Sequence, residues 1–175
     1  MNAQPTPRRS RARRLRRPTP AEYGEFIRQI ELIDIWLVEA RVVNNRGTRA
    51  PRRASLAIAR TEATWSGTDD GFDIRFPYAV RFTEGDEVHA EIEITFGLHF
   101  TSAEPMTDEV FVIFKDVNLP VNVWPFLREF VSTTLGRMGW QPYTLPAYKI
   151  GGPAEDGDVE KATSAGERSR TRGRQ

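Results

Sequence analysis

Residues 87–100 have the sequence EVHAEIEITFGLHF, in which apolar and polar side chains alternate along the whole stretch. Successive side chains of a β-strand point to opposite faces of the sheet, so a period of two indicates one buried face and one solvated face. The face expected to be buried carries Val88, Ala90, Ile92, Ile94, Phe96, Leu98 and Phe100. A strand with one solvated face is typical of an antiparallel sheet.

Three segments before this strand are also predicted as strands. Residues 72–82 alternate in the same way, between turn sequences at 67–71 and 84–86. Residues 55–65 fit a strand less clearly, because their apolar residues alternate with alanines. Residues 30–42 are apolar on much of both faces. Those expected to share one face are Leu32, Trp36, Val38, Ala40 and Val42. Four consecutive strands with short links predict an antiparallel meander.

Helix signals lie on both sides of the strands. Residues 19–22 are Thr-Pro-Ala-Glu, a capping box with proline at the first helical position, and an apolar stripe follows at helical spacing. After Pro105 a short helix is predicted up to about Val117, and a second from about Asn122, because Pro125 is tolerated only in a first turn. Helices that follow strands instead of alternating with them predict an α+β fold, with the helices on the apolar face of the sheet.

The net charge of +1 is an average over two unlike parts. Residues 1–17 contain seven arginines and no acid, which leaves 18 basic against 24 acidic residues in the rest of the chain. We predict a disordered Arg-rich arm at 1–18, one domain at 19–150 and a disordered polar tail at 151–175. The chain has no cysteine and no secretory signal pattern, so a cytoplasmic location without membrane insertion is expected.

Residue patterns of an active site are not found. The sequence has no glycine-rich phosphate loop, no serine elbow and no cluster of metal ligands, so no enzyme, cofactor or metal site is predicted. His89 and His99 are ten strand residues apart, about 33 Å, and are expected to be solvated surface residues. The acids Glu87, Glu91 and Glu93 are placed on the same polar face, where they either keep the sheet solvated or form an acidic docking surface.

The Arg-rich arm gives an alternative function. Clustered arginines bind phosphates through counterion release, so nonspecific contact with nucleic acid is one reading of this arm. No aromatic residue is interleaved with these arginines. A flexible arm without a dedicated role is the other reading.

Aromatic residues are concentrated after residue 110, in a stretch too short to bury them all. They either cover the sheet and seal an oligomer interface, or line a groove for an extended apolar ligand. The segment 140–148, WQPYTLPAY, is predicted to be extended because prolines and the residues before them resist helix.

Residues 118–130, NLPVNVWPFLREF, and the segment that continues to Leu145 resemble the SecB family of chaperones. The resemblance rests on the Pro-aromatic-aliphatic-Arg-Glu start of the long helix, where Arg128 and Glu129 follow Pro125 and Phe126, and on the Pro-aromatic-Thr-Leu loop. It covers roughly residues 30–150. It implies a four-stranded antiparallel sheet with a long helix on one face, assembled as a homotetramer (a dimer of dimers) with the long helices between two sheet layers.

The resemblance also implies a function, which is to hold unfolded polypeptides without ATP in a groove beneath the extended loop. The residues expected to line that groove are Trp124, Phe126, Phe130, Trp140, Tyr143, Leu145 and Tyr148. Export members of the family have a further helix after the loop and contact the motor ATPase SecA, and the polar tail here offers no such helix. The chain is more similar to SecB-like chaperones that guard antitoxins. The expected clients are therefore unfolded preproteins awaiting export, or an antitoxin.

Overall fold

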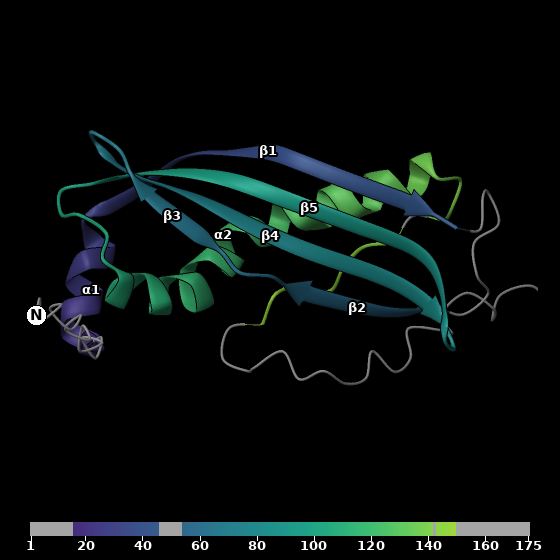
Figure 1. The fold of residues 1–175 in the computed structure, drawn as a ribbon, viewed down its shortest axis with the longest axis horizontal. Helices are drawn as coiled ribbons and strands as arrows, with labels where there is room; N and C mark the ends of the chain where they lie inside the picture. The colour runs from purple at the N-terminus through teal and green to yellow at the C-terminus, as the bar shows by residue number, and fades with distance from the viewer. Residues whose placement is uncertain (1–15, 46–53, 142, 150–175) are drawn as a thin grey trace, which may run out of the picture.

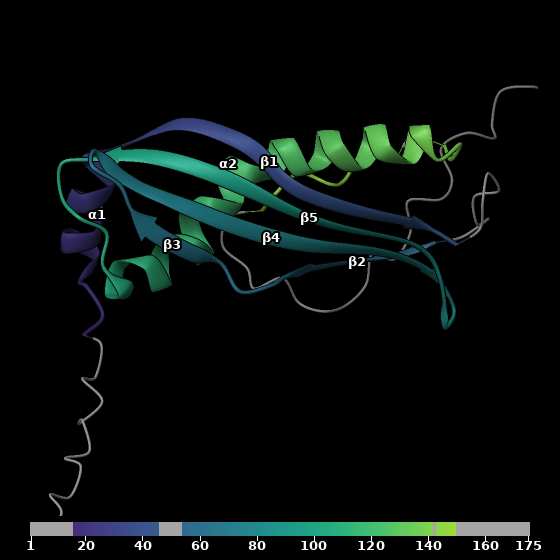
Figure 2. The ribbon, with the colours of Figure 1, turned by 45° about the horizontal axis from the view of Figure 1, so that its top comes forward.

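The computed structural model describes residues 16–45, 54–141 and 143–149, which form a sheet with helices on one face (Figures 1 and 2). In chain order the elements are α1 (Pro20–Arg28), β1 (Ile30–Asn44), β2 (Ser55–Arg60), β3 (Thr64–Gly67), β4 (Gly71–Glu84), β5 (Glu87–Ser102) and α2 (Asp108–Arg137). This confirms the predicted α+β class. The predicted tail, and the predicted arm up to residue 15, lie outside the described residues.

Helix α1 begins at the predicted capping box. The Thr19 hydroxyl accepts a bond from the backbone N–H of Glu22 (3.2 Å), and the Glu22 carboxylate accepts one from the backbone N–H of Thr19 (2.7 Å). The buried ring of Phe26 stacks on Phe72 of β4, with the ring centroids 6.2 Å apart. The Tyr23 hydroxyl donates to the side chain of Asn118 in α2. These contacts fix the short helix at one end of the sheet.

The strand order is β1-β5-β4-β2, with β3 also paired to β4, and all pairs are antiparallel. The predicted meander is therefore wrong at β1, which pairs with β5 instead of with its successor β2. Strand lengths give the physical reason. One side of the 16-residue β5 pairs with β4. On the other side, β1 with its 15 residues can hydrogen-bond along nearly the whole strand, whereas β2 has only 6 residues.

The strand predicted at residues 55–65 is divided in two. Residues 61–63 leave the ladder, and Ala63 is buried at this break. Strand β2 pairs with residues 78–83 of β4, and β3 pairs with residues 72–75. The sheet consequently has five strands, where four were predicted.

Two bulges in β1 change which side chains share a face. Its pairing with β5 shifts between Leu32 and Asp34 and again between Leu37 and Glu39. Each extra residue reverses the alternation, so Trp36 lies opposite Gly97 on the polar face and not beside Leu32 as predicted. The indole occupies the space above the glycine, since a Cβ at Gly97 would stand 2.3 Å from a ring carbon of Trp36.

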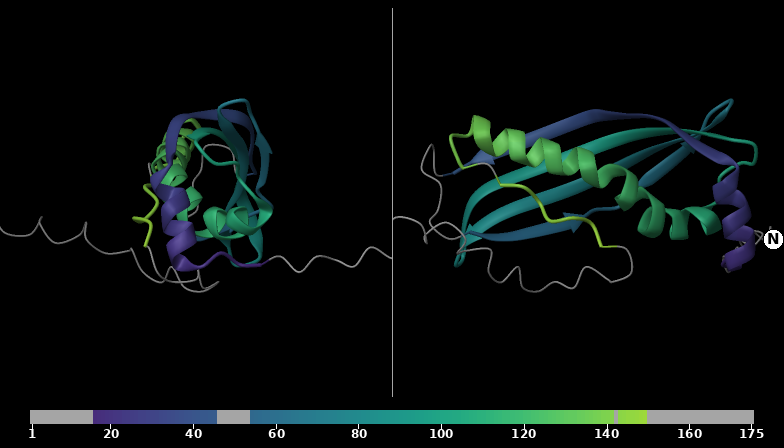
Figure 3. Two further views of the ribbon diagram at one scale, coloured as in Figure 1. Left: turned by 90° about the vertical axis from the view of Figure 1, so that its left-hand side faces the viewer. Right: turned by 180° about the vertical axis from the view of Figure 1, so that it is seen from behind.

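The two helices predicted after Pro105 are one 30-residue helix, α2, about 45 Å long, with Pro120 and Pro125 inside it. Its N-terminus is capped as expected, by the Thr107 hydroxyl accepting from the backbone N–H of Val110. Figure 3 shows that α2 bends in its first half. Proline lacks the N–H of the helical ladder, so a bend is the expected accommodation. The helix continues past both prolines because its apolar stripe packs on the sheet.

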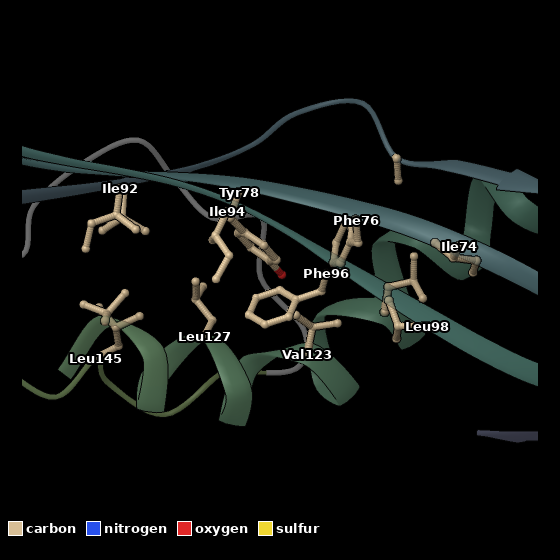
Figure 4. Packing of buried hydrophobic residues seen from close by; sticks show 14 of the residues in the cluster. Ile74, Phe76, Tyr78, Ile92, Ile94, Phe96, Leu98, Val123, Leu127 and Leu145 are labelled. Carbon is tan, nitrogen blue, oxygen red and sulfur yellow. The ribbon is translucent and has the colours of Figure 1, made fainter. Parts of the chain in front are cut away.

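The core lies between the sheet and α2 (Figure 4). The predicted apolar rows of β4 and, from Ala90 onward, of β5 face the helix, which confirms the alternation there, whereas Val88 lies beyond a bulge opposite Thr83 and is half-buried. The buried residues of α2 opposite them include Leu119, Val123, Leu127, Val131 and Leu135. By length and hydropathy alone α2 would pass as a membrane-crossing helix. Here its most buried side chains are those that pack on the sheet.

Candidate functional site

The segment after α2 turns back and runs alongside the helix in the same layer (Figure 3, right). Gly139 has a φ of 75°, the left-handed conformation that glycine adopts at helix ends, and the N–H of Trp140 bonds to the carbonyl of Leu135 at 3.0 Å. Residues 141 and 143–149, which we call the return segment together with Trp140, have no helical or strand structure. The described part of this stretch is thus non-helical, as its prolines predicted.

Aromatic side chains attach the return segment to the sheet and to α2. Trp140 and Tyr143 both pack edge-on against Phe82 of β4, with ring centroids 5.7 and 6.2 Å from it. Trp124 of α2 packs against Tyr148 (5.4 Å), and its indole N–H donates to the carbonyl of Pro146 (2.7 Å). The bond from the Trp124 indole is the one hydrogen bond of the described residues 141 and 143–149. The segment is therefore held mainly by side-chain packing.

The predicted groove residues fall into two groups. Trp124, Trp140, Tyr143, Leu145 and Tyr148 come together around the return segment, and Leu145 is fully buried in the core. Phe126 is about 200° and Phe130 about 240° around the helix axis from Trp124, so both point to another side of α2, and Phe130 is partly buried against the core. Phe126 is 45% exposed. The residues of the first group are thus occupied with one another in the free chain.

Three side-chain polar atoms, one each on β4, α2 and the return segment, are buried and have no hydrogen-bond partner among the described residues. They are the Tyr78 hydroxyl, the Trp140 indole nitrogen and Nε of Arg128. Burial raises the pKa of Tyr78 far above its ordinary value, so the hydroxyl keeps its proton. The sequence pattern placed Tyr78 in an apolar row, and its hydroxyl was the signal that could have set it apart.

The outer face of the sheet carries paired charges of both signs. Arg81 contacts Glu91 at 2.6 Å, Arg41 contacts Glu93 at 3.4 Å, and Arg75 contacts Glu39 at 3.7 Å. A third predicted docking acid, Glu87, stands opposite Glu84 beyond a bulge in the β4–β5 pairing, out of the row that holds the other two. The acids of this face are therefore largely matched by arginines of neighbouring strands.

The two histidines differ from the prediction and from each other. His89 is fully buried, with its ring nitrogens 3.5 Å from Glu84 and 3.7 Å from Glu87. The prediction of a surface residue is wrong there because His89 lies at the bulge between Phe82 and Thr83, where the alternation breaks. His99 is mostly covered as well. Its Nδ1 is 2.7 Å from Asp73, and its Nε2 is 3.4 Å from Asp70. No group of metal ligands occurs in the part of the chain that the structure describes.

His99 should make folding stability depend on pH. The hydrogen bond to Asp73, followed by that to Asp70, raises the pKa of His99 above its ordinary value. The stabilisation is complete below the pKa of the unfolded chain, about 6.5, and disappears as the pH rises through the folded-state value. We expect the urea midpoint of the native chain to exceed that of His99→Gln at pH 5.5, and the two to converge at pH 8.5. An equal gap at both values would contradict this assignment.

Comparison with known proteins supports the architecture. No protein-family model and no curated protein matches the sequence. Among solved structures, the chain is similar to the SecB-like chaperone Rv1957 of Mycobacterium tuberculosis, determined in complex with a ChAD peptide from the antitoxin HigA1 (Rv1956). The TM-score is 0.63 at 17% identity, over 72% of this chain and 96% of that chain. The chain therefore has the SecB-like fold, as the resemblance in the sequence predicted.

Proposed function

We propose that this protein is an ATP-independent holding chaperone, which binds unfolded polypeptide at the site that the return segment occupies in the free chain. The observation that carries the proposal is the seating of that segment. An extended apolar stretch lies along α2 with Leu145 buried in the core, and among the described residues 141 and 143–149 it has one hydrogen bond, to the Trp124 indole. A client of the same chemistry would make the same kind of contacts.

The mode of attachment explains broad client choice. Burial of apolar side chains is non-directional, and its contribution is about 25 cal/mol per Å² of apolar surface. Such contacts depend on the size and apolarity of the client more than on its sequence. Exchange with a client is feasible because displacing the return segment breaks no backbone ladder.

We further propose that the clients are of the antitoxin type and not preproteins awaiting export. The similar mycobacterial chain binds an antitoxin peptide. Two of the acids predicted as a docking surface are also paired within the chain, since Glu91 and Glu93 each contact an arginine, and this leaves them less available to a partner such as SecA. A genomic neighbourhood with a toxin-antitoxin pair would support this choice, and neighbouring export genes would oppose it.

The assembly we propose is a dimer of dimers. Among the described strands β1 pairs with β5 alone, so it is an edge strand that a second copy could extend. Large apolar side chains are exposed on this strand and on α2, at Ile33, Trp36, Leu37, Val42, Val112, Val117, Val121 and Phe126. Exposed apolar residues in such number on two elements are typical of surfaces that are covered in an assembly.

Site-directed crosslinking tests the client site directly, because the chain has no cysteine. A photocrosslinker on Trp124→Cys, on the helix that stays in place when the return segment is displaced, should attach to an unfolded client. The same label on Asp69→Cys, in the exposed turn between β3 and β4, should attach far less. A client mixed with the unlabelled native chain should also aggregate less, without nucleotide.

Two results would refute the proposal. Undiminished client aggregation at a molar excess of the native chain would remove the chaperone function. Equal crosslinking from residues 69 and 124, with aggregation suppressed, would leave the function but move the site.

A further inference from the structure

The Tyr78 hydroxyl stands out among the side chains that face α2. The inner rows of β4 and β5 contain the aromatic residues Phe72, Phe76, Tyr78, Phe82, Phe96 and Phe100. Tyr78 is the one hydroxyl-bearing aromatic in these two strands. Its ring packs edge-on against Phe76 at 4.9 Å, as a phenylalanine ring would. The packing therefore does not account for the oxygen.

A buried hydroxyl without a partner is costly. Removing it from water without a replacement hydrogen bond costs about 1–3 kcal/mol, and most buried polar groups in proteins are paired. Tyr78 is 2% exposed, and its oxygen has no partner among the described residues. A phenylalanine at this position would avoid the cost. The unpaired hydroxyl thus lowers the stability of the free chain, and a bound molecule that offers a hydrogen-bond acceptor can remove this cost.

The position of Tyr78 relates it to the return segment. Figure 4 shows its side chain directed from β4 into the space between the sheet and α2. Tyr148 of the return segment is near enough to affect the Tyr78 hydroxyl electrostatically, as is Arg60 at the end of β2. Tyr148 in turn packs against Trp124. A polypeptide that replaces the return segment would pass this hydroxyl.

We propose that the main chain of a bound client supplies the missing acceptor for the Tyr78 hydroxyl, in the place that residues 143–148 hold in the free chain. This inference rests on the proposed chaperone function. The partner is an extended apolar polypeptide, and the acceptor is a backbone carbonyl oxygen.

A carbonyl acceptor fits a site that must accept many sequences. Every residue of a client has a backbone carbonyl, so a hydroxyl donor recognises polypeptide without selecting side chains. The apolar contacts of Trp124 and Phe82 would hold the client side chains, and Tyr78 would fix its main chain. Binding would then depend partly on one polar atom in a largely apolar site.

The test is Tyr78→Phe in the full chain, with two measurements that should move in opposite directions. Urea unfolding of the free variant should show a midpoint equal to or above that of the native chain, because an unpaired buried hydroxyl is lost. Affinity for reduced and carboxymethylated α-lactalbumin, a permanently unfolded probe, should fall about three- to tenfold, the value of one hydrogen bond. Tyr23→Phe makes the same chemical change in α1, outside the proposed client site, and should alter the affinity less than twofold.

Each other outcome is decisive. A Tyr78→Phe variant that is less stable in the free state, or does not fold, would show that the hydroxyl is already paired without a client. Unchanged affinity with unchanged or raised stability would show that the client does not use it. Both results overturn the inference and leave the chaperone proposal standing, whereas failure of the native chain to bind the unfolded probe would overturn the chaperone proposal itself.

Discussion

Replacement of both Val117 and Val121 by lysine is expected to halve the mass of the assembled particle while each subunit stays folded. The two valines are one helical turn apart on α2, and they are 48% and 41% exposed in the single chain. In a dimer of dimers with the long helices between the sheet layers, these side chains would be covered by the partner pair. Lysines there would lose their hydration and face like charges across the two-fold axis, a cost of several kcal/mol.

Light scattering after size-exclusion chromatography measures the effect. The matched control is Thr64→Lys with Asp69→Lys, which adds two lysines at exposed positions in β3 and the following turn and should leave the mass unchanged. Urea midpoints of both variants should be close to that of the native chain, because surface substitutions seldom change stability by more than about 0.5 kcal/mol. If the variant with lysine at positions 117 and 121 keeps the full native mass, α2 is excluded from the interface.

Gly71→Ala is expected to destabilise the chain more than any exposed substitution, by about 3 kcal/mol or more. A Cβ at Gly71 would stand 1.9 Å from the carbonyl oxygen of Phe100 and 2.8 Å from Cα of Thr101. Both are backbone atoms of β5, so no side chain can rotate to relieve the overlap. The first residues of β4 would have to separate from β5, where Phe72 and Phe100 stack at 5.2 Å.

Gly67→Ala is the control for this substitution. Gly67 ends β3 on the other side of the same turn, and a Cβ there would meet nothing within 4 Å. We expect its urea midpoint to be equal to or above the native value, since alanine restricts the unfolded chain. Similar midpoints for the two variants would mean that β4 and β5 are further apart at Gly71 than the structure places them.

Local patterns in the sequence predicted the elements whose burial follows from chain geometry alone. The alternation in residues 87–100 identified the inner row of β5 because successive strand side chains necessarily point to opposite faces. The capping box at Thr19 identified the start of α1, since its hydrogen bonds join residues only three apart. The family resemblance at residues 118–130 predicted the SecB-like fold, which the structural comparison supports.

The predictions failed where contacts between distant residues outweigh local preference. Pro120 and Pro125 each remove a helical hydrogen bond, yet α2 is continuous because Leu119, Val123 and Leu127 are buried against the sheet on either side of them. His89 is buried because the bulge in the β4–β5 ladder interrupts the period of two. Neither effect has a sequence signal within a few residues.

The aromatic residues of the predicted groove show the same division. Their composition after residue 110 indicated an apolar site, and the prolines indicated an extended segment. Only the folded chain brings Trp124 onto Tyr148 and Trp140 onto Phe82, and separates Phe126 from them around the helix. The unpaired hydroxyl of Tyr78 likewise depends on what surrounds it in three dimensions.

The alternating stretch at residues 87–100 was sufficient for the strand and its buried face, because these follow from side-chain geometry along a single segment, and the α+β class followed from the order of strand and helix signals along the chain. Its neighbours were not determined in this way. Strand β5 pairs with β4, which it meets through a short turn, and with β1, which precedes it by more than forty residues. The tertiary structure decided that pairing, because the 15 residues of β1 can bond along nearly the whole length of the 16-residue β5, and no local pattern in the sequence encodes such a match between distant segments.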